Sequence, residues 1–434
     1  MGYDEILDRK NVDEKREFVQ RFVSARDNIV QFVASRLGWS HDAKFAGIKK
    51  GSFNVSFVVR NVGDGSKVLI RFPFPGQVYT PWLEEKVTNE VMVLGYIHTH
   101  TTIPVPRVLA WGPADVSPSQ LGPFIIMEFI EGTPLDTLMG DPTVPEKDPP
   151  VLDPAIDERK LTFVYDQIAS LMLQLSRLPF SRIGAIGETA VSRRPLTYDM
   201  NELVTITGTP ASAFPDGPFD KASDYFNAVA HYHRVRLSTQ RNAVYDAKDA
   251  RRHLAACQGL AKLIPQYCDQ EEGYFLYIDD FHPTNILADP DTWQITAVVD
   301  LEFINAMPAQ YAYDVPPWLL LREPPVGRSP EMNELETLFT RRMEQFLAAV
   351  QRAETASPDS QYPSLSAKMR ESWDTKRFWF NLAMRNPLDA SAIYEYNLRG
   401  PVVLDQNESP EIELFVAKKL KQLEEYKREE AQIS

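Results

Sequence analysis

Two short apolar runs, each ending in polar residues, constrain the fold of this chain most strongly. The first, Tyr274 to Ile278, is typical of a strand and leads into a loop that contains Asp280 and Asn285. The second, Ile295 to Val299, follows a turn rich in Asp and Pro and ends at Asp300. We therefore expect three oxygen-bearing side chains at or just past strand ends, where a rigid sheet can direct them at one point.

This set of side chains suits a magnesium ion and a phosphoryl group. Phosphoryl transfer needs an aligned acceptor hydroxyl, hard oxygen ligands for Mg²⁺ and neutralisation of the charge on the moving phosphate. An ordinary capped loop is the alternative, because Asp and Asn are common turn residues. Asp280 and Asn285 alone would favour that alternative, but Asp300 and the N-terminal features described below favour the first interpretation.

On these residues the chain resembles the aminoglycoside phosphotransferase and choline kinase family, small-molecule kinases with the protein-kinase fold, and especially its fungal members. The family's catalytic loop has an aspartate, four residues and an asparagine, and a downstream strand ends in a metal-binding aspartate. Asp280, Asn285 and Asp300 match these positions, within a resemblance that covers most of residues 40 to 325. It implies that Asp280 positions a hydroxyl and takes its proton, while Asn285 and Asp300 hold Mg²⁺ on the phosphates of ATP.

The chain departs from the family pattern at Ile278, where a histidine usually stands two residues before the catalytic aspartate. That histidine mostly braces the loop through backbone hydrogen bonds, so an apolar residue packed into the same core can replace it. We expect the departure to affect the rate more than the fold.

The N-terminal part combines helical and strand patterns. Residues 12 to 37 have apolar positions at spacings of three and four, which predicts a helix. Strand-like pieces follow at 44 to 49, 54 to 60 and 68 to 72. Because such strands need cover to be stable, we expect the helix predicted over 83 to 97 to pack on them.

A carboxylate interrupts the apolar seam of that last helix. Glu90 lies in the middle of positions that step by three and four residues, so it should be buried. An unpaired buried charge costs several kcal/mol, and Arg71 at the end of the preceding strand is the obvious partner. The resemblance implies that this pair contacts the nucleotide, with Arg71 where protein-kinase-like folds have a lysine. The alternative is a purely structural ion pair.

A turn between the first two strands is the candidate phosphate-covering segment. Gly51 would let the backbone approach a phosphate closely, and Ser52 and neighbouring backbone N–H groups could donate to it. The signal is weak because one glycine can equally shape a hairpin.

The apolar run from Phe124 to Phe129 corresponds in the resembling family to the hinge that pairs with adenine. Met127, Glu128 and Phe129 are therefore the expected neighbours of the base. A plain core strand leading into a turn would have the same residues.

The sequence gives several candidate residues for the pocket of the acceptor substrate and does not select among them. In the family it is formed by the region equivalent to residues 196 to 268 and by C-terminal helices, and the candidates here are Asp216, Asp220, Asp224, His231, Tyr232 and His233. A solvated helix face is the better interpretation for each of these taken singly. Glu302 is a candidate outer or second-shell metal ligand, and Asp314 is a candidate for the same region or for a helix cap.

Composition excludes some partners. The net charge of −14 argues against a nucleic-acid partner, which needs clustered Lys and Arg. No stretch approaches the roughly 18 apolar residues needed to span a bilayer. Two cysteines and an N-terminus without a basic, apolar leader predict a cytoplasmic location, and the oligomeric state is left open.

The sequence of 434 residues thus predicts an α+β, protein-kinase-like fold with two lobes. A β-rich, nucleotide-binding lobe with a leading helix would span residues 1 to 130, and a mainly helical lobe with the catalytic loop would span 131 to 434. The predicted activity is transfer of the γ-phosphate of ATP, with Mg²⁺, to a hydroxyl of a small molecule whose identity the sequence does not give. Two alternatives stay open: a nucleotide-binding pseudokinase with weak or no activity, and nucleotidyl transfer or ATP-driven condensation on the same fold.

Overall fold

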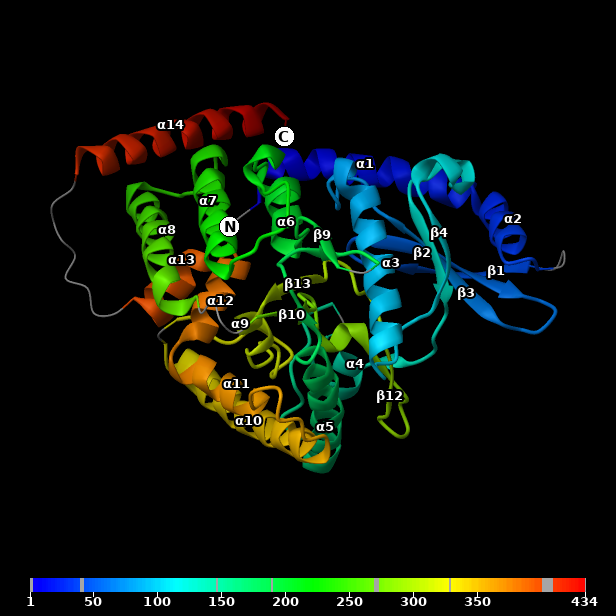
Figure 1. The fold of residues 1–434 in the computed structure, drawn as a ribbon. Helices are drawn as coiled ribbons and strands as arrows, with labels where there is room; N and C mark the ends of the chain where they lie inside the picture. Colours follow the sequence, from blue (N-terminus) through cyan, green and yellow to red (C-terminus); the bar gives the residue numbers. More distant parts are fainter. Residues whose placement is uncertain are drawn as a thin grey trace.

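The computed structural model of the chain describes residues 3–39, 43–145, 147–188, 190–268, 273–327, 329–399 and 409–433. It has an antiparallel sheet in its N-terminal part and a mainly helical C-terminal part, which confirms the expected α+β class (Figure 1).

The N-terminal sheet has five antiparallel strands in the order β1-β2-β3-β5-β4. Their ranges lie close to those that the sequence predicts: β1 Ala43–Lys50, β2 Asn54–Asn61, β3 Lys67–Pro73, β4 Val108–Gly112 and β5 Phe124–Glu128. Because side chains alternate along a strand, Phe72 of β3 points to one face of the sheet and Arg71 to the other.

Helices cover both faces of this sheet. On one face lie α1 (Glu5–Ser24) and α2 (Arg26–Arg36), where Phe22 stacks on Phe57 with ring centroids 4.1 Å apart. On the other lies α3 (Leu83–His100), whose Val87 packs with Met127. The cover by α3 is confirmed, but the single helix predicted over 12 to 37 is in fact two helices that meet at Ala25. With cover on both faces, β2 is buried continuously from Asn54 to Val59.

The first half of α1 contacts the C-terminal part of the chain. The side chain of Asn11 donates to the carbonyl oxygen of Thr205 over 2.6 Å, and the backbone N–H of Asp4 donates to that of Ile206 over 2.7 Å. Both carbonyls belong to α6 (Tyr198–Thr207). Helix α1 therefore spans from the helical part to the sheet.

Two three-stranded sheets carry the polar loops. In one, β10 (Tyr274–Tyr277) lies between β13 (Asn305–Pro308) and β7 (Pro179–Phe180). In the other, β11 (Ile286–Ala288) lies between β12 (Ile295–Val298) and β6 (Thr133–Pro134). The expectation that one sheet directs all three polar residues is wrong, since β10 and β12 belong to different sheets.

Helices form most of the remaining C-terminal part. Their ranges, with those of one further strand pair, are α4 Leu135–Met139, α5 Glu158–Leu175, β8 Ala185–Ile186, β9 Val191–Arg193, α7 Ala222–Thr239, α8 Ala247–Tyr267, α9 Ala309–Ala312, α10 Pro330–Ala356, α11 Leu365–Asp374, α12 Arg377–Arg385, α13 Ala390–Ile393 and α14 Pro410–Ile433. Helix α14 runs beside α8 and ends near the start of α1, where the hydroxyl of Tyr426 accepts a hydrogen bond from the backbone N–H of Glu5 over 2.8 Å (Figure 1). Within the described ranges, no helix has the length and apolar character needed to cross a membrane.

Candidate active site

A cleft of about 900 Å³ lies between the N-terminal sheet and the loops of the β11–β12 hairpin. Residues of both parts line it, and six of them are predicted site residues: Gly51, Arg71, Met127, Glu128, Phe129 and Asp300. Its volume is within the range of small-molecule and cofactor sites. Ser52 and Glu90 do not line it, because Ser52 lies on the exposed turn and Glu90 is buried behind Arg71.

Arg71 connects three segments at this cleft. Its guanidinium forms an ion pair with Glu90 of α3, and its Nη1 lies 2.5 Å from Oδ1 of Asp300. The expected pairing of Arg71 with Glu90 is thus confirmed, and Asp300 is a second partner. The Glu90 side chain is only 1% exposed, so without a cation its charge would be strongly unfavourable.

Asp300 reaches this position through an unusual backbone turn. It follows β12 with a φ of +61°, and Phe303 has the same positive φ three residues later. Non-glycine residues occupy this left-handed region rarely, although Asp and Asn do so more readily than most. The turn takes the chain away from the line of β12 and leaves the Asp300 carboxylate beside Arg71.

Asn285 fixes the loop that contains Asp280. Its side-chain Nδ2 donates to Oδ2 of Asp280 over 2.9 Å and to the Asp280 carbonyl over 3.1 Å. Its own carbonyl accepts from the backbone N–H of Val299 over 2.8 Å, at the end of the β11–β12 ladder. Asn285 and Asp300 therefore extend from neighbouring positions of one hairpin, and Asn285 contacts Asp280 directly.

The oxygen atoms at this point fit a magnesium ion shared with a nucleotide. With its Nδ2 committed to Asp280, Asn285 offers Oδ1 as a ligand atom, and Asp300 offers a carboxylate. Mg²⁺ is usually held by one or two protein carboxylates, with phosphates and waters completing six ligands. No group of three or more His, Cys, Asp or Glu side chains suited to a metal occurs among the described residues. The donors thus match a site that phosphates complete and not an all-protein cage.

The environment of Asp280 suits proton transfer near neutral pH. Desolvation by the surrounding walls raises the pKa of Asp280 to about 7, and the neighbouring carboxylate of Asp300 acts in the same direction. The hydrogen bond from Asn285 opposes this shift. A general base works best when its pKa lies near the working pH.

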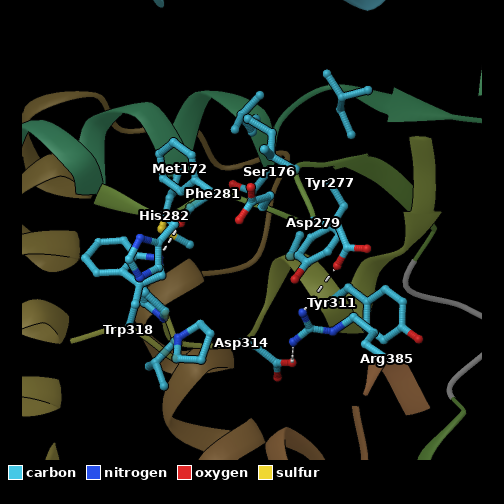
Figure 2. Close-up of a pocket in the computed structure, with 18 of the residues that line it drawn as sticks. Met172, Ser176, Tyr277, Asp279, Phe281, His282, Tyr311, Asp314, Trp318 and Arg385 are labelled. Atoms are coloured by element: carbon cyan, nitrogen blue, oxygen red, sulfur yellow. Dashed lines mark hydrogen bonds and ion pairs between the residues drawn. The ribbon is translucent and has the colours of Figure 1, made fainter. Parts of the chain in front are cut away.

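Figure 2 shows a second, smaller pocket, whose volume is about 110 Å³. Asp280 is one of the residues that line it. Other walls of that pocket come from β10, from the segment after β13 and from α12, and include Tyr277, Asp279, Phe281, His282, Tyr311, Asp314, Trp318, Glu323 and Arg385. The indole N–H of Trp318 donates to the carbonyl of Phe281, which ties the loop to the opposite wall. Aromatic rings and acidic groups thus surround the side of Asp280 away from the large cleft.

Lys86 was not predicted as a site residue from the sequence, although it is buried beside Glu90, Glu302 and Asn54. Its ammonium group forms an ion pair with Glu302, lies 3.7 Å from Oε2 of Glu90, and donates to Oδ1 of Asn54 over 3.1 Å. Asn54 in turn donates to Oε2 of Glu302 over 3.0 Å. Burial lowers the pKa of Lys86, and the charge of Glu302 opposes that shift. A lysine four residues before Glu90, on the same buried helix face, is a signal that was present in the sequence.

Glu302 occupies a different place from the one expected for an outer metal ligand. Its side chain is buried, and its Oε2 contacts Lys86 and Asn54. Asp314 is also buried and accepts hydrogen bonds from Ser372 and Asn381, so it does not cap a helix.

The acceptor-pocket candidates from 216 to 233 line neither pocket described above. Asp220 pairs with Arg182 at the surface, with Oδ1 2.6 Å from Nε. Tyr232 and His233 are buried, and Tyr232 donates to Asp199 over 2.8 Å. Tyr232 and His233 therefore belong to the interior of the helical part, and the smaller pocket is lined instead by residues next to Asp280.

Two curated fungal proteins share part of this sequence. Both are named "Altered inheritance of mitochondria protein 9, mitochondrial". The protein from Clavispora lusitaniae is 30% identical over 183 residues, which is 41% of this chain and 28% of that protein. The one from Debaryomyces hansenii is 27% identical over 216 residues, 46% of this chain and 32% of that protein. The alignments thus span less than a third of the length of these relatives, and no family model matches the chain.

These names contradict the cytoplasmic location expected from the sequence, because both relatives are named as mitochondrial proteins. The expectation used only cysteine content and the absence of an obvious leader.

Several solved structures are also similar to this chain over most of its length, each with a TM-score below 0.5. Aminoglycoside phosphotransferase APH(4)-Ia has 16% identity and a TM-score of 0.45, with 84% of this chain and 98% of that chain covered. A Plasmodium vivax ethanolamine kinase has 12% identity and a TM-score of 0.42, with 89% and 82% covered. Choline kinase LicA from Streptococcus pneumoniae has 12% identity and a TM-score of 0.40, with 92% and 99% covered.

Proposed function

We propose that this chain is an ATP-dependent phosphotransferase that moves the γ-phosphate to a hydroxyl of a small molecule. The observation that carries the proposal is the ion pair between Arg71 and Asp300 at the large cleft. Asn285 lies close to the same hairpin end, because its carbonyl accepts from the N–H of Val299, and its side chain donates to Asp280. A cation, two metal-type oxygen ligands and a base are the groups that phosphoryl transfer requires.

In this proposal the large cleft takes the nucleotide. The wall for the base is formed by the end of β5 and the residue after it, Met127, Glu128 and Phe129. Gly51 lies over the phosphates. Arg71 offsets phosphate charge and Glu90 holds its guanidinium in place. When bound, Mg-ATP supplies the transferable phosphoryl group, and Asn285 and Asp300 are the residues that would hold its metal.

The smaller pocket takes the acceptor. Asp280 lines it, accepts a hydrogen bond from Asn285, and can therefore orient a hydroxyl and take its proton as transfer proceeds. The volume of about 110 Å³ limits the part of the acceptor that enters to a small group.

Binding and turnover can be tested separately. Calorimetry with Mg-ATP measures binding, and release of ADP over a panel of hydroxyl metabolites measures turnover. Binding together with ADP release and a phosphorylated product supports the proposal. Binding without turnover would indicate a nucleotide-binding pseudokinase, and an adenylated product would indicate nucleotidyl transfer.

Arg71→Met should weaken Mg-ATP binding by about tenfold to a hundredfold, because a hydrogen bond to a charged group contributes roughly 1.5–3 kcal/mol. Arg71→Lys, which keeps the charge, should lose less. Calorimetric affinity is the measurement, and thermal unfolding checks that each variant is folded. Equal affinity in folded Arg71→Met and the wild type would remove Arg71 from the nucleotide site.

We also propose a mitochondrial location, on the ground that both curated relatives are named as mitochondrial proteins. Fractionation of cells that express the tagged protein tests this, and recovery only with cytosolic markers would contradict it.

A further inference from the structure

Asp279, the residue before the proposed base, is held by groups from two distant parts of the chain. Burial raises the pKa of its carboxyl group, and the charge of Arg385 and the backbone N–H of Tyr198, the first residue of α6, both act to lower it. Its Oδ1 also lies 3.6 Å from Nη1 of Arg385, at the end of α12. The Asp279 side chain is only 15% exposed, so these contacts are shielded from solvent.

Arg385 is fixed on several sides (Figure 2). Its side chain is 10% exposed, and the guanidinium carbon lies 5.1 Å and 5.2 Å from the ring centroids of Tyr277 and Tyr311. Its Nη2 lies 3.8 Å from Oδ2 of Asp314. The guanidinium therefore sits beside two aromatic rings and bridges two carboxylates, with little room to move.

Asp314 is itself anchored. The hydroxyl of Ser372 donates to it over 2.6 Å, and Nδ2 of Asn381 lies 3.0 Å from both of its oxygens. Ser372 belongs to α11 and Asn381 to α12. A continuous set of buried contacts thus runs from these two helices through Asp314 and Arg385 to Asp279.

The loop's other anchors act at different atoms. Trp318 and Asn285 donate to the backbone carbonyls of Phe281 and Asp280. The preceding residue, Ile278, is apolar and buried, and its side chain has no polar group with which to hold the loop. Asp279 is therefore the point at which the entry to the loop is tied by charge to the helical part.

We infer that Arg385 is a positioning residue, which acts through Asp279 to hold Asp280 in the orientation needed for transfer. The catalytic consequence rests on the proposed phosphotransferase function, whereas the effect on the loop does not. Because Asp280 directly follows Asp279, a shift of the held carboxylate moves the base, and a misplacement of about 1 Å can lower a rate on the order of a hundredfold.

The test uses the chain of 434 residues and compares it first with Asp279→Asn, Arg385→Gln and the double variant. Asp279→Asn is nearly isosteric and keeps the protein testable if loss of the buried arginine prevents folding. Amide hydrogen exchange, followed by mass spectrometry, reports how often residues 278 to 285 open. We expect exchange of these amides to rise about tenfold or more in each single variant, while α10 keeps its protection. The double variant should add little, because both changes break one contact.

Glu323→Gln is the matched control. Glu323 lines the same pocket and its replacement removes one negative charge near Arg385, but it is not one of the anchors of Asp279. Its loop exchange should equal that of the wild type. Unchanged exchange in folded Asp279→Asn, or an equal rise in Glu323→Gln, would overturn the inference.

Turnover separates positioning from a general structural effect. With an acceptor from the metabolite panel, kcat of Asp279→Asn should fall about tenfold to a hundredfold with the KM for Mg-ATP unchanged, and Arg385→Lys should keep more activity than Arg385→Gln. Loop opening without any loss of kcat would overturn the positioning role. A wild-type chain that releases no ADP would instead contradict the proposed function, and the exchange result would still decide whether Arg385 holds the loop.

Discussion

Asp280→Ala should lower turnover on the order of 10²–10⁴-fold, the usual contribution of a positioned general base, while leaving the affinity for Mg-ATP nearly intact. Asp280 lines the small pocket and not the large cleft, so its loss removes the base without removing a wall of the nucleotide site. The measurement is ADP release with an acceptor at saturating ATP, together with calorimetric affinity for Mg-ATP.

Asp291→Ala provides the matched control for Asp280→Ala. Asp291 is an exposed aspartate in the turn between β11 and β12 and lines neither pocket. Its replacement should leave both turnover and affinity unchanged. If Asp280→Ala kept wild-type turnover while folded, Asp280 would not be the base. A large loss of Mg-ATP affinity would instead place Asp280 in the nucleotide site.

Lys86→Met should lower the free energy of unfolding by about 3–5 kcal/mol, the usual effect of removing one partner from a buried ion pair. Lys86 and Glu302 are both almost completely buried, and Glu90 is 3.7 Å from the same ammonium group. Without Lys86, Glu302 would keep a hydrogen bond from the neutral amide of Asn54 and the weaker influence of the Arg71 charge. Chemical denaturation followed by a spectroscopic signal measures the change.

A second lysine allows this effect to be separated from simple loss of charge. Lys421 and Glu425 form an exposed pair four residues apart on α14, the same spacing as Lys86 and Glu90 on α3. Lys421→Met should cost at most about 1 kcal/mol, as exposed pairs usually do. The double variant Lys86→Met with Glu302→Leu should recover part of the loss, because it leaves no uncompensated carboxylate at position 302. A cost for Lys86→Met as small as that for Lys421→Met would contradict the buried network.

The buried network joins three segments of the chain. Lys86 belongs to α3, Asn54 to the start of β2, and Glu302 to the turn that carries Asp300. In the proposed function these segments surround the phosphates of the nucleotide. Preorganised charge of this kind is the main device by which an enzyme stabilises a transition state.

The sequence was most informative where the structure depends on neighbouring residues: on the alternation of side chains along a strand, on helical periodicity, or on the short spacing of residues within one loop. Alternation along β3 places Arg71 on the face opposite Phe72, and steps of three and four along α3 place Glu90 on its buried side. The pairing of Arg71 with Glu90 could be predicted because a buried charge requires a partner and Arg71 ends the strand that precedes this helix, although Lys86, four residues before Glu90, is a nearer cation. Asp280 and Asn285 were found for a similar reason, since only four residues separate them in one loop and few arrangements are possible.

Contacts between distant segments could not be predicted in this way. Arg385 meets Asp279, and Lys86 meets Glu302, only because the chain folds back over long separations. In the sequence each of these is an isolated charge, and an isolated charge most often lies on a solvated face.

The sequence by itself therefore determined the class of fold, the strands and loops that carry the polar residues, and the pairing of one arginine with one buried glutamate. Only the tertiary structure decided that α1 and α2 cover the second face of the sheet, that β10 and β12 lie in separate sheets, and that Lys86 pairs with Glu302 and Arg385 with Asp279. The physical reason is that periodicity and capping act over a few residues. The burial of a charge, in contrast, is stabilised by whichever partner the packing of the whole chain brings within reach.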